Sequence, residues 1–250
     1  MIAITGGKTM SIFTRFGSAA LIAFLMLILS GCLYPDEQRA GANASAREAV
    51  LTVQDAVDRY KASTEVLPIV NADADVPIYE KFKLDFGKLQ RTGYLASIPG
   101  IAFENGGTVV FIVIDEETKP QVKLMDVVVF QAVDGVQSRV NEYRKKHQGD
   151  NPAGEEAYPG FRTIDFGKLG GSEPKIRSMY SGQTLSLLVN DKGIVYVDYG
   201  IDISAALKKT DAAPGAEEDL RRRLVDASYY VPVKSPVYRW VGEAPQAVES

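Results

Sequence analysis

The chain has 250 residues, of which 46% are hydrophobic and 24% are charged, and its formal net charge is −4. This hydrophobic content is enough for a folded core, and the length allows one large or two small domains. The acidic balance argues against nucleic-acid binding and against electrostatic attachment to anionic lipid. A single cysteine and a single histidine exclude an internal disulfide and any metal site that needs two histidines.

The N-terminal segment has the features of a secretory signal. Residues 18–29 form the uncharged apolar run SAALIAFLMLIL, with two basic residues before it and small residues after it. A basic region, an apolar region and a small-residue cleavage site define such a signal. The run is shorter than the roughly 20 apolar residues that a transmembrane helix needs. We therefore predict a lipoprotein signal peptide over residues 1–31, starting at Met1 or Met10.

The apolar run ends in a lipobox, Leu29-Ser30-Gly31-Cys32. A thioether-linked diacylglycerol requires a cysteine at this place, behind a small residue that the signal peptidase accommodates. Two or more acyl chains, such as palmitate, give stable anchoring because each buried methylene contributes about 0.8 kcal/mol. We predict lipidation at Cys32 and a location on the outer face of the cell membrane. The alternatives are an uncleaved anchor and plain secretion.

Removal of the signal leaves 219 residues, from Cys32 to Ser250, with 26 Lys and Arg against 32 Asp and Glu, a formal charge of −6. Residues 32–44 are polar and small, so they are predicted to form a tether between the lipid and the domain. The following residues, Ser45-Ala46-Arg47-Glu48, match a capping box and predict the start of the first helix.

Two segments of the mature chain recur in the same order. The hexapeptide Leu84-Asp85-Phe86-Gly87-Lys88-Leu89 returns as Ile164-Asp165-Phe166-Gly167-Lys168-Leu169, 80 residues later. Upstream, residues 53–61 parallel residues 136–144 at an offset of 83. Two matches at nearly equal offsets indicate a tandem duplication, which is an internal repeat of one structural unit.

Each repeat is predicted to contain a helix, a loop, the hexapeptide and an antiparallel β-hairpin. In both helices the apolar positions fall on one face at helical spacing, and Asp126 is placed to cap the second helix. The predicted fold class is therefore α+β, with units at residues 45–126 and 127–209. The predicted strands, paired as two hairpins, are residues 109–114, 122–125, 185–189 and 194–199.

The C-terminal residues 210–250 are predicted to form a third helix, from about residue 217 to 228, and a Pro-rich tail. The helix is acidic at its start and contains three consecutive arginines, which suits its macrodipole. The tail from Val231 has three prolines and is expected to pack late or to stay loose. Tyrosines and Trp240 crowd this half of the chain; they are interpreted mostly as core residues, or else as a surface for a protein or glycan.

The first unit resembles the globular half of type II secretion pseudopilins. The matching residues are Ala56-Val57-Asp58-Arg59-Tyr60-Lys61, Pro68, Tyr94-Leu95-Ala96-Ser97-Ile98-Pro99 and Gly106-Gly107. Those proteins keep a long methylated N-terminal helix, whereas this chain has a lipobox. The resemblance therefore implies a fold, a helix packed on an antiparallel sheet, and no assembly function.

The whole chain resembles an uncharacterised lipoprotein family of Gram-positive spore-forming bacteria. The residues that carry this resemblance are 32–39, 79–89 and 102–107. Some members are labelled periplasmic binding proteins of ABC transporters. The resemblance implies an extracytoplasmic location and brings no catalytic residue.

The repeated tetrapeptides Asp85-Phe86-Gly87-Lys88 and Asp165-Phe166-Gly167-Lys168 are the candidate structural or ligand-contacting motif. In the structural interpretation, each Phe fills the core, each Gly turns the backbone and each Lys pairs with the preceding Asp. In the other interpretation the same side chains contact a ligand.

No metal, cofactor or catalytic residue is predicted. Asn71, Asp73 and Asp75 alternate like the start of a calcium loop, but Val76 and Phe82 stand where that loop needs Gly and Glu. The one histidine, His147, follows three basic residues at a helix end, where a cation is favoured. No nucleophile motif or pair of carboxylates stands out.

These observations predict a membrane-anchored, non-catalytic binding or envelope-associated lipoprotein. Its expected partner is another envelope protein or a cell-wall component. The alternative is a solute-binding lipoprotein of an ABC transporter. A deep polar cleft would favour the solute, and a flat aromatic patch would favour a protein partner.

Overall fold

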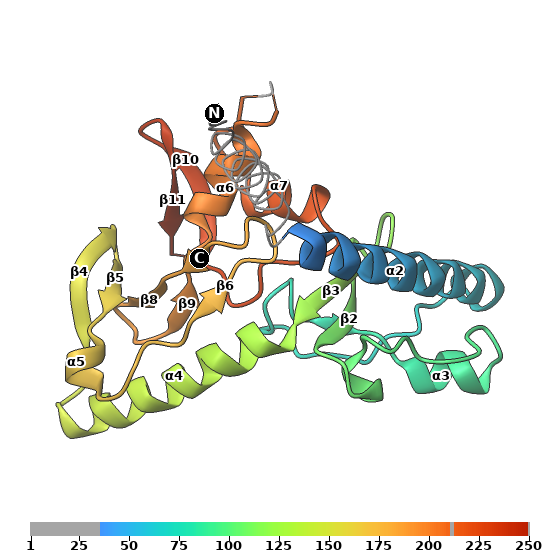
Figure 1. Ribbon diagram of the computed structural model, residues 1–250, viewed down its shortest axis with the longest axis horizontal. Coiled ribbons are helices and arrows are strands. Elements are labelled where there is room, and N and C mark those ends of the chain that lie inside the picture. The colour runs from blue at the N-terminus through green and yellow to red at the C-terminus, as the bar shows by residue number, and fades with distance from the viewer. Residues whose placement is uncertain (1–35, 211–212, 250) are drawn as a thin grey trace, which may run out of the picture. The chain divides into compact units, whose positions relative to one another are not determined.

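The computed structural model describes residues 36–210 and 213–249 (Figure 1). The residues from Ala46 onward form one compact unit, here called unit 46–250. The predicted signal peptide, the lipobox and Cys32 lie outside the described residues. Within the described part, no helix is both long and apolar enough to cross a membrane. The described fold is α+β with small antiparallel sheets, which confirms the predicted class.

Helix α2 covers Asp36–Thr64 and begins well before the predicted capping box. Residues 36–44 were expected to belong to a tether, and they form the first turns of α2. The tether itself stays a prediction. They start with the sequence DEQRA, which combines acidic residues for the first turn with strong helix formers. Ser45 therefore lies inside the helix and does not cap it.

The first half of unit 46–250 packs α2 on a three-stranded antiparallel sheet of order β1-β2-β3, here called the central sheet. Phe111 and Leu124 of this sheet are buried against Val53 and Val57 of α2. The observed hairpin β2–β3 agrees with the predicted strands. The elements that follow α2 are β1 (Phe82–Lys83), α3 (Phe86–Arg91), η1 (Phe103–Asn105), β2 (Val109–Ile114) and β3 (Gln121–Asp126).

The second half packs helix α4 (Val127–Lys146) on a four-stranded antiparallel sheet of order β4-β5-β8-β9. The Asp126 carboxylate accepts the N–H groups of Val128 and Val129 at 2.8 and 3.2 Å, which confirms it as the helix cap. Figure 1 shows α4 leaving the end of β3 and running along this half to α5. The elements after α4 are β4 (Ala153–Tyr158), β5 (Phe161–Ile164), α5 (Phe166–Leu169), β6 (Ile176–Arg177), β7 (Thr184–Leu185), β8 (Leu187–Asn190) and β9 (Val195–Val197).

The C-terminal part corrects two expectations. Its helix α7 is shorter than predicted, because Glu218 accepts the N–H of Gly215 at 3.0 Å and so forms a turn ahead of it. The Pro-rich tail is not loose: Val233 and Tyr238 are fully buried, because the apolar residues of the tail enter the core of the second half. The elements here are α6 (Gly200–Leu207), α7 (Arg221–Asp226), β10 (Val237–Val241) and β11 (Ala244–Val248).

Strand β2 is buried on both faces. Phe111 and Val113 belong to the core that contains α2, whereas Ile112 and Ile114 belong to the core of the second half. A continuous apolar run, VVFIVI, is what a strand covered on both sides requires, since neither set of alternating side chains meets water. The central sheet is therefore shared by both cores.

The C-terminal segment pairs with the free edges of both sheets. Leu124 of β3 donates its N–H to the Tyr229 oxygen at 2.8 Å and accepts the N–H of Val231 at 3.0 Å. Val197 of β9 donates its N–H to the Lys234 oxygen at 2.8 Å. An uncovered edge strand would leave such groups without partners, so this segment covers the β3 edge of one sheet and the β9 edge of the other.

The two halves use the same strand register. In each half, a residue two positions before the hexapeptide is paired with a residue on the first strand of the hairpin. That residue is in turn paired with a residue on the second strand of the hairpin. These residues are Phe82, Val113 and Val122 in the first half and Arg162, Val189 and Val195 in the second.

A glutamine in each long helix fixes the hairpin that packs on it. The Gln54 Oε1 accepts the N–H of Val122 at 2.7 Å, and the Gln137 Oε1 accepts the N–H of Val195 at 2.8 Å. The Nε2 of Gln54 donates to the Pro120 oxygen at 3.1 Å, and the Nε2 of Gln137 donates to the Gly193 oxygen at 2.8 Å. Equivalent contacts in the two halves are expected for a duplicated unit; the duplication itself stays a prediction.

We expect Gln54→Ala and Gln137→Ala each to lower the free energy of unfolding by about 1–3 kcal/mol, because each leaves partly buried backbone groups without a partner. Urea denaturation measures the change. Gln90→Ala, at an exposed position of α3, is the matched control and should stay within about 0.5 kcal/mol of the parent. Parent-like stability of both variants would contradict the proposed role of the glutamines.

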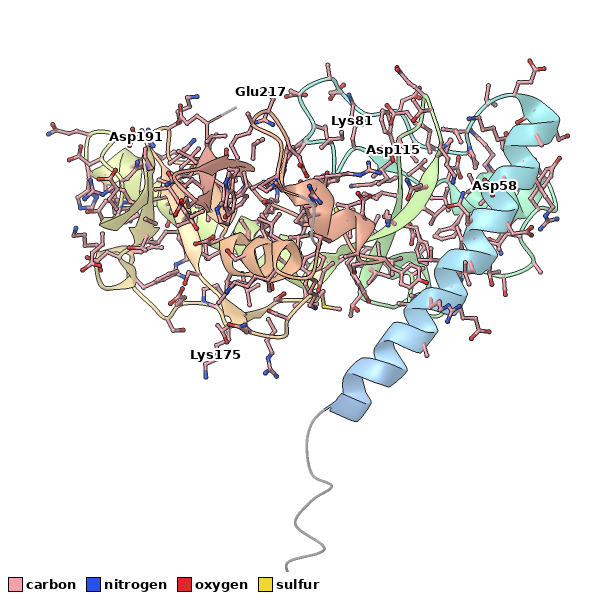
Figure 2. All side chains as sticks on the ribbon, turned by 90° about the horizontal axis from the view of Figure 1, so that it is seen from above. Asp58, Lys81, Asp115, Lys175, Asp191 and Glu217 are labelled. Carbon is pink, nitrogen blue, oxygen red and sulfur yellow. The ribbon has the colours of Figure 1, made fainter. Side chains whose placement is uncertain are left out.

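Two basic side chains join the central sheet to α7. The buried Lys123 Nζ donates to the carbonyl oxygens of Val225 and Ser228 at 2.7 and 2.8 Å. These oxygens lie at the C-terminal end of α7, where the helix dipole favours a cation. Arg222 donates to both carboxylate oxygens of Asp115, labelled in Figure 2, at 2.8 and 2.9 Å. These contacts attach the C-terminal part to the β2–β3 hairpin.

Lys123→Met should lower the free energy of unfolding by about 1–3 kcal/mol, because it leaves two carbonyl oxygens at the end of α7 without their donor. The control is Lys83→Met at an exposed position of β1, which should change stability far less. Thermal unfolding of Lys123→Met and Lys83→Met measures the difference. Equal melting temperatures of the two variants would contradict the proposed role of Lys123.

Candidate functional site

A pocket of about 300 Å³ lies where several segments of unit 46–250 meet. The loop at residues 75–78 lines one part, and the β8–β9 hairpin, whose turn Asp191 marks in Figure 2, lines another. Residues 235–237 and the end of β11 complete the lining. This volume is at the lower end of the range for small-ligand sites.

Asn190 at the end of β8 is a buried polar side chain of this pocket, with 3% of its surface exposed. Its Oδ1 accepts the N–H of Ile194 at 2.8 Å across the hairpin turn, which fixes the orientation of the amide. Among the described residues, its Nδ2 has no hydrogen-bond acceptor. The side chain therefore offers a donor to a molecule in the pocket.

Arg221 at the start of α7 is the second buried polar side chain, with 8% of its surface exposed. Its Nε and Nη2 donate to the Asp219 carboxylate at 3.0 and 2.6 Å, and its Nη1 donates to the Ser235 oxygen at 3.2 Å. The guanidinium lies 5.1 Å from the ring centroid of Tyr79. A guanidinium has five N–H groups, so two have no acceptor in the part of the chain that the structure describes.

The other lining residues carry charges of both signs and apolar surface. Asp75 and Glu249 are acidic, and Lys192 Nζ lies 3.5 Å from the Glu249 Oε2. Both members of this pair are well exposed, so the pair contributes little stability and can be exchanged for other partners. Ile78 and Ile194 add apolar side chains that are 52% and 43% exposed.

The two predicted tetrapeptides do not line the pocket; each supplies the N-cap of a short helix. The Asp85 Oδ1 accepts the N–H of Lys88 at 2.8 Å, and the Asp165 Oδ1 accepts those of Gly167 and Lys168 at 2.9 and 3.2 Å. Lys168 Nζ also lies 3.6 Å from the Asp165 Oδ2, so one of the two predicted ion pairs is present. Lys88 contacts Asp85 through its backbone N–H.

The aromatic and glycine residues of the tetrapeptides differ in part from the structural interpretation. Phe86 is buried, but Phe166 is only half-buried and lies against Arg139, whose guanidinium is 5.6 Å from the ring centroid. Gly87 and Gly167 do not turn the backbone. They lie inside α3 and α5, because the Asp cap starts each helix at the following Phe.

The remaining sequence candidates lie apart from one another. Asn71 and Asp73 are in an exposed loop, and Asp75 lines the pocket. Within residues 36–210 and 213–249, no group of three or more His, Cys, Asp or Glu side chains could hold a metal ion. His147 ends α4, where its ring stacks on Tyr143 with centroids 3.8 Å apart.

Sequence reasoning missed the pocket because its polar residues come from separate segments. Asn190 lies between the predicted strands 185–189 and 194–199, and Arg221 lies within the predicted helix from about residue 217 to 228, so neither was predicted as a binding residue. Among the crowded tyrosines, Tyr199 and Tyr238 are core residues, whereas Tyr196 lines the pocket. No spacing in the sequence links these positions.

The first half of the unit matches a known family. Residues 46–126 match the YphF family N-terminal domain, which agrees in part with the predicted membership of an uncharacterised family. Searches of curated proteins and of solved structures found no significant match. The resemblances to lipoproteins and to pseudopilins stay predictions.

Buried tyrosines make the fold sensitive to high pH. Burial is the main cause of the raised pKa of Tyr79, which reaches about 12. Burial likewise raises the pKa of six others, Tyr158, Tyr180, Tyr196, Tyr199, Tyr230 and Tyr238. An unfolded tyrosine ionises near pH 10. Above that pH the folded state binds more protons than the unfolded state, so stability falls as pH rises.

The urea midpoint should therefore fall steeply between about pH 10 and 12, while the contribution of these tyrosines is fully present below about pH 10. Burial lowers the pKa of Lys123 and acts in the opposite direction over part of this range, but it is one group against seven. Absorbance at 295 nm, which reports tyrosinate, should rise together with unfolding. A midpoint that stays constant up to pH 12 would contradict this expectation.

Proposed function

We propose that the chain is a lipid-anchored, extracytoplasmic binding protein without catalytic activity. The observation that carries the proposal is the lipobox Leu29-Ser30-Gly31-Cys32 at the end of an apolar signal. Lipidation of Cys32 would attach the domain to the outer face of the cell membrane. Its partner would be another envelope protein or a cell-wall component.

The chemistry of the pocket supports binding without catalysis. Its lining contains neither histidine nor cysteine. The hydroxyl of Ser235 donates to the Pro236 oxygen at 2.9 Å, and within the described residues no base contacts it. A nucleophilic serine needs a base within hydrogen-bonding reach, so the lining groups are suited to recognition.

The second candidate function is that of a solute-binding lipoprotein of an ABC transporter. The pocket of about 300 Å³ favours it, because buried donors and exposed apolar side chains surround a volume of small-molecule size. Antiparallel sheets speak against the paired parallel-sheet lobes expected of a transporter receptor. The pocket therefore favours a small ligand without identifying a transporter.

We also propose that the family similarity extends to the lipoprotein family named above and that the two halves arose by tandem duplication. The matching glutamine contacts of α2 and α4 support the duplication. So does the common strand register of the two hairpins.

The anchoring is tested by Cys32→Ser in cells fed an alkyne analogue of palmitate. The parent protein should be labelled and should sediment with membranes, whereas the variant should be unlabelled and should leave the membrane fraction. Ser30→Ala keeps a small residue before the cleavage site and should behave like the parent. Membrane retention of Cys32→Ser protein would overturn the anchor.

A further inference from the structure

We propose that the pocket binds a small zwitterion of the amino-acid or dipeptide type. Its carboxylate would lie toward Asn190 and Arg221, and its ammonium toward Asp75 and Glu249. The inference rests on the binding role proposed above and names the class of ligand.

The buried part of the pocket supplies the donors that a carboxylate needs. Asn190 Nδ2 and two N–H groups of Arg221 have no acceptor among the described residues, and both side chains are more than nine-tenths buried. Guanidinium groups bind carboxylates through parallel, charge-assisted hydrogen bonds. Both side chains are largely buried, so the effective dielectric constant around them is lower than in bulk water and their interaction with an anionic group is stronger than that of fully exposed side chains.

The exposed part of the pocket supplies acceptors for an ammonium group. Asp75 has no ion pair within the described residues, and Glu249 has only the loose contact with Lys192. An ammonium group donates up to three hydrogen bonds, which two carboxylates can accept. The opposite ends of the ligand would thus meet opposite charges.

The charge balance of the lining favours a neutral ligand with both charges over a simple anion. Two cationic residues, Lys192 and Arg221, face two acidic ones, Asp75 and Glu249, and Asp219 already pairs with Arg221. A phosphate would bring net negative charge into a site that has no excess positive charge. A zwitterion adds no net charge.

The size and apolar surface of the pocket suit the rest of such a molecule. About 300 Å³ corresponds to roughly ten water molecules at about 30 Å³ each, which is the size of an amino acid or a dipeptide of small residues. Ile78, Ile194 and the ring of Tyr196 line the same space. They provide contacts for an aliphatic side chain.

The test is calorimetric titration of the full chain in mild detergent with the twenty free L-amino acids, L-alanyl-L-alanine and D-alanyl-D-alanine. At least one of these should bind, and its N-acetyl and C-amide derivatives should bind at least about tenfold more weakly, since each lacks one charge. Preference for an amino acid would indicate a free solute, and preference for a dipeptide a peptide source. The absence of binding across the panel, or a derivative that binds as tightly as its parent compound, would overturn the inference.

Two variants locate the binding in the pocket. Asn190→Asp keeps the acceptor for the Ile194 N–H but replaces the donor, so binding should fall at least about tenfold. Ile194→Trp should obstruct the pocket and abolish binding even if Asn190→Asp does not fold. Ile201→Trp, at a similarly exposed isoleucine of α6 outside the lining, is the matched control. Unchanged binding by folded Ile194→Trp would overturn the site.

Failure of the ligand inference is distinguishable from failure of the anchor. Zwitterion binding by a chain that is not lipidated would leave the ligand in place and remove the membrane location. Lipidation without zwitterion binding would leave the location and remove the ligand.

Discussion

The burial of β2 on both faces is the constraint on which the fold depends. Phe111 and Val113 require the cover of α2, and Ile112 and Ile114 require the cover of the second half. Since apolar area removed from water stabilises by about 25 cal/mol per Å², neither half can separate without exposing one face of this strand. The central sheet therefore makes two similar arrangements of helix and hairpin into one folded unit.

The pocket forms because the two halves pack together on the central sheet. Loop 75–78 comes from the first half, and the β8–β9 hairpin comes from the second. The C-terminal segment pairs with both sheets and so brings Arg221 and Ser235 to the same place. Binding groups that are far apart in the chain thus meet only when both halves and the C-terminal segment are folded together.

Local patterns predicted much of the fold. Strand β2, the hairpin to β3 and the Asp126 cap follow from a continuous apolar run, turn residues and capping chemistry within a few positions. The start of α2 was placed too late because the capping box at Ser45 hid the helix-forming residues before it. The burial of the tail depends on the tertiary contacts of Tyr238, which no local pattern predicts. The pocket was beyond prediction, because the turn residue Asn190 and the helix residue Arg221 acquire their roles only from partners distant in sequence.

The most direct test of the shared sheet is differential scanning calorimetry of the full chain. If both cores depend on β2, residues 46–250 unfold in one transition whose calorimetric enthalpy equals the van't Hoff enthalpy. Weakening the attachment of α7 to the central sheet, as in Lys123→Met, should then shift that whole transition without splitting it. Two resolved transitions, one for each half, would contradict the account.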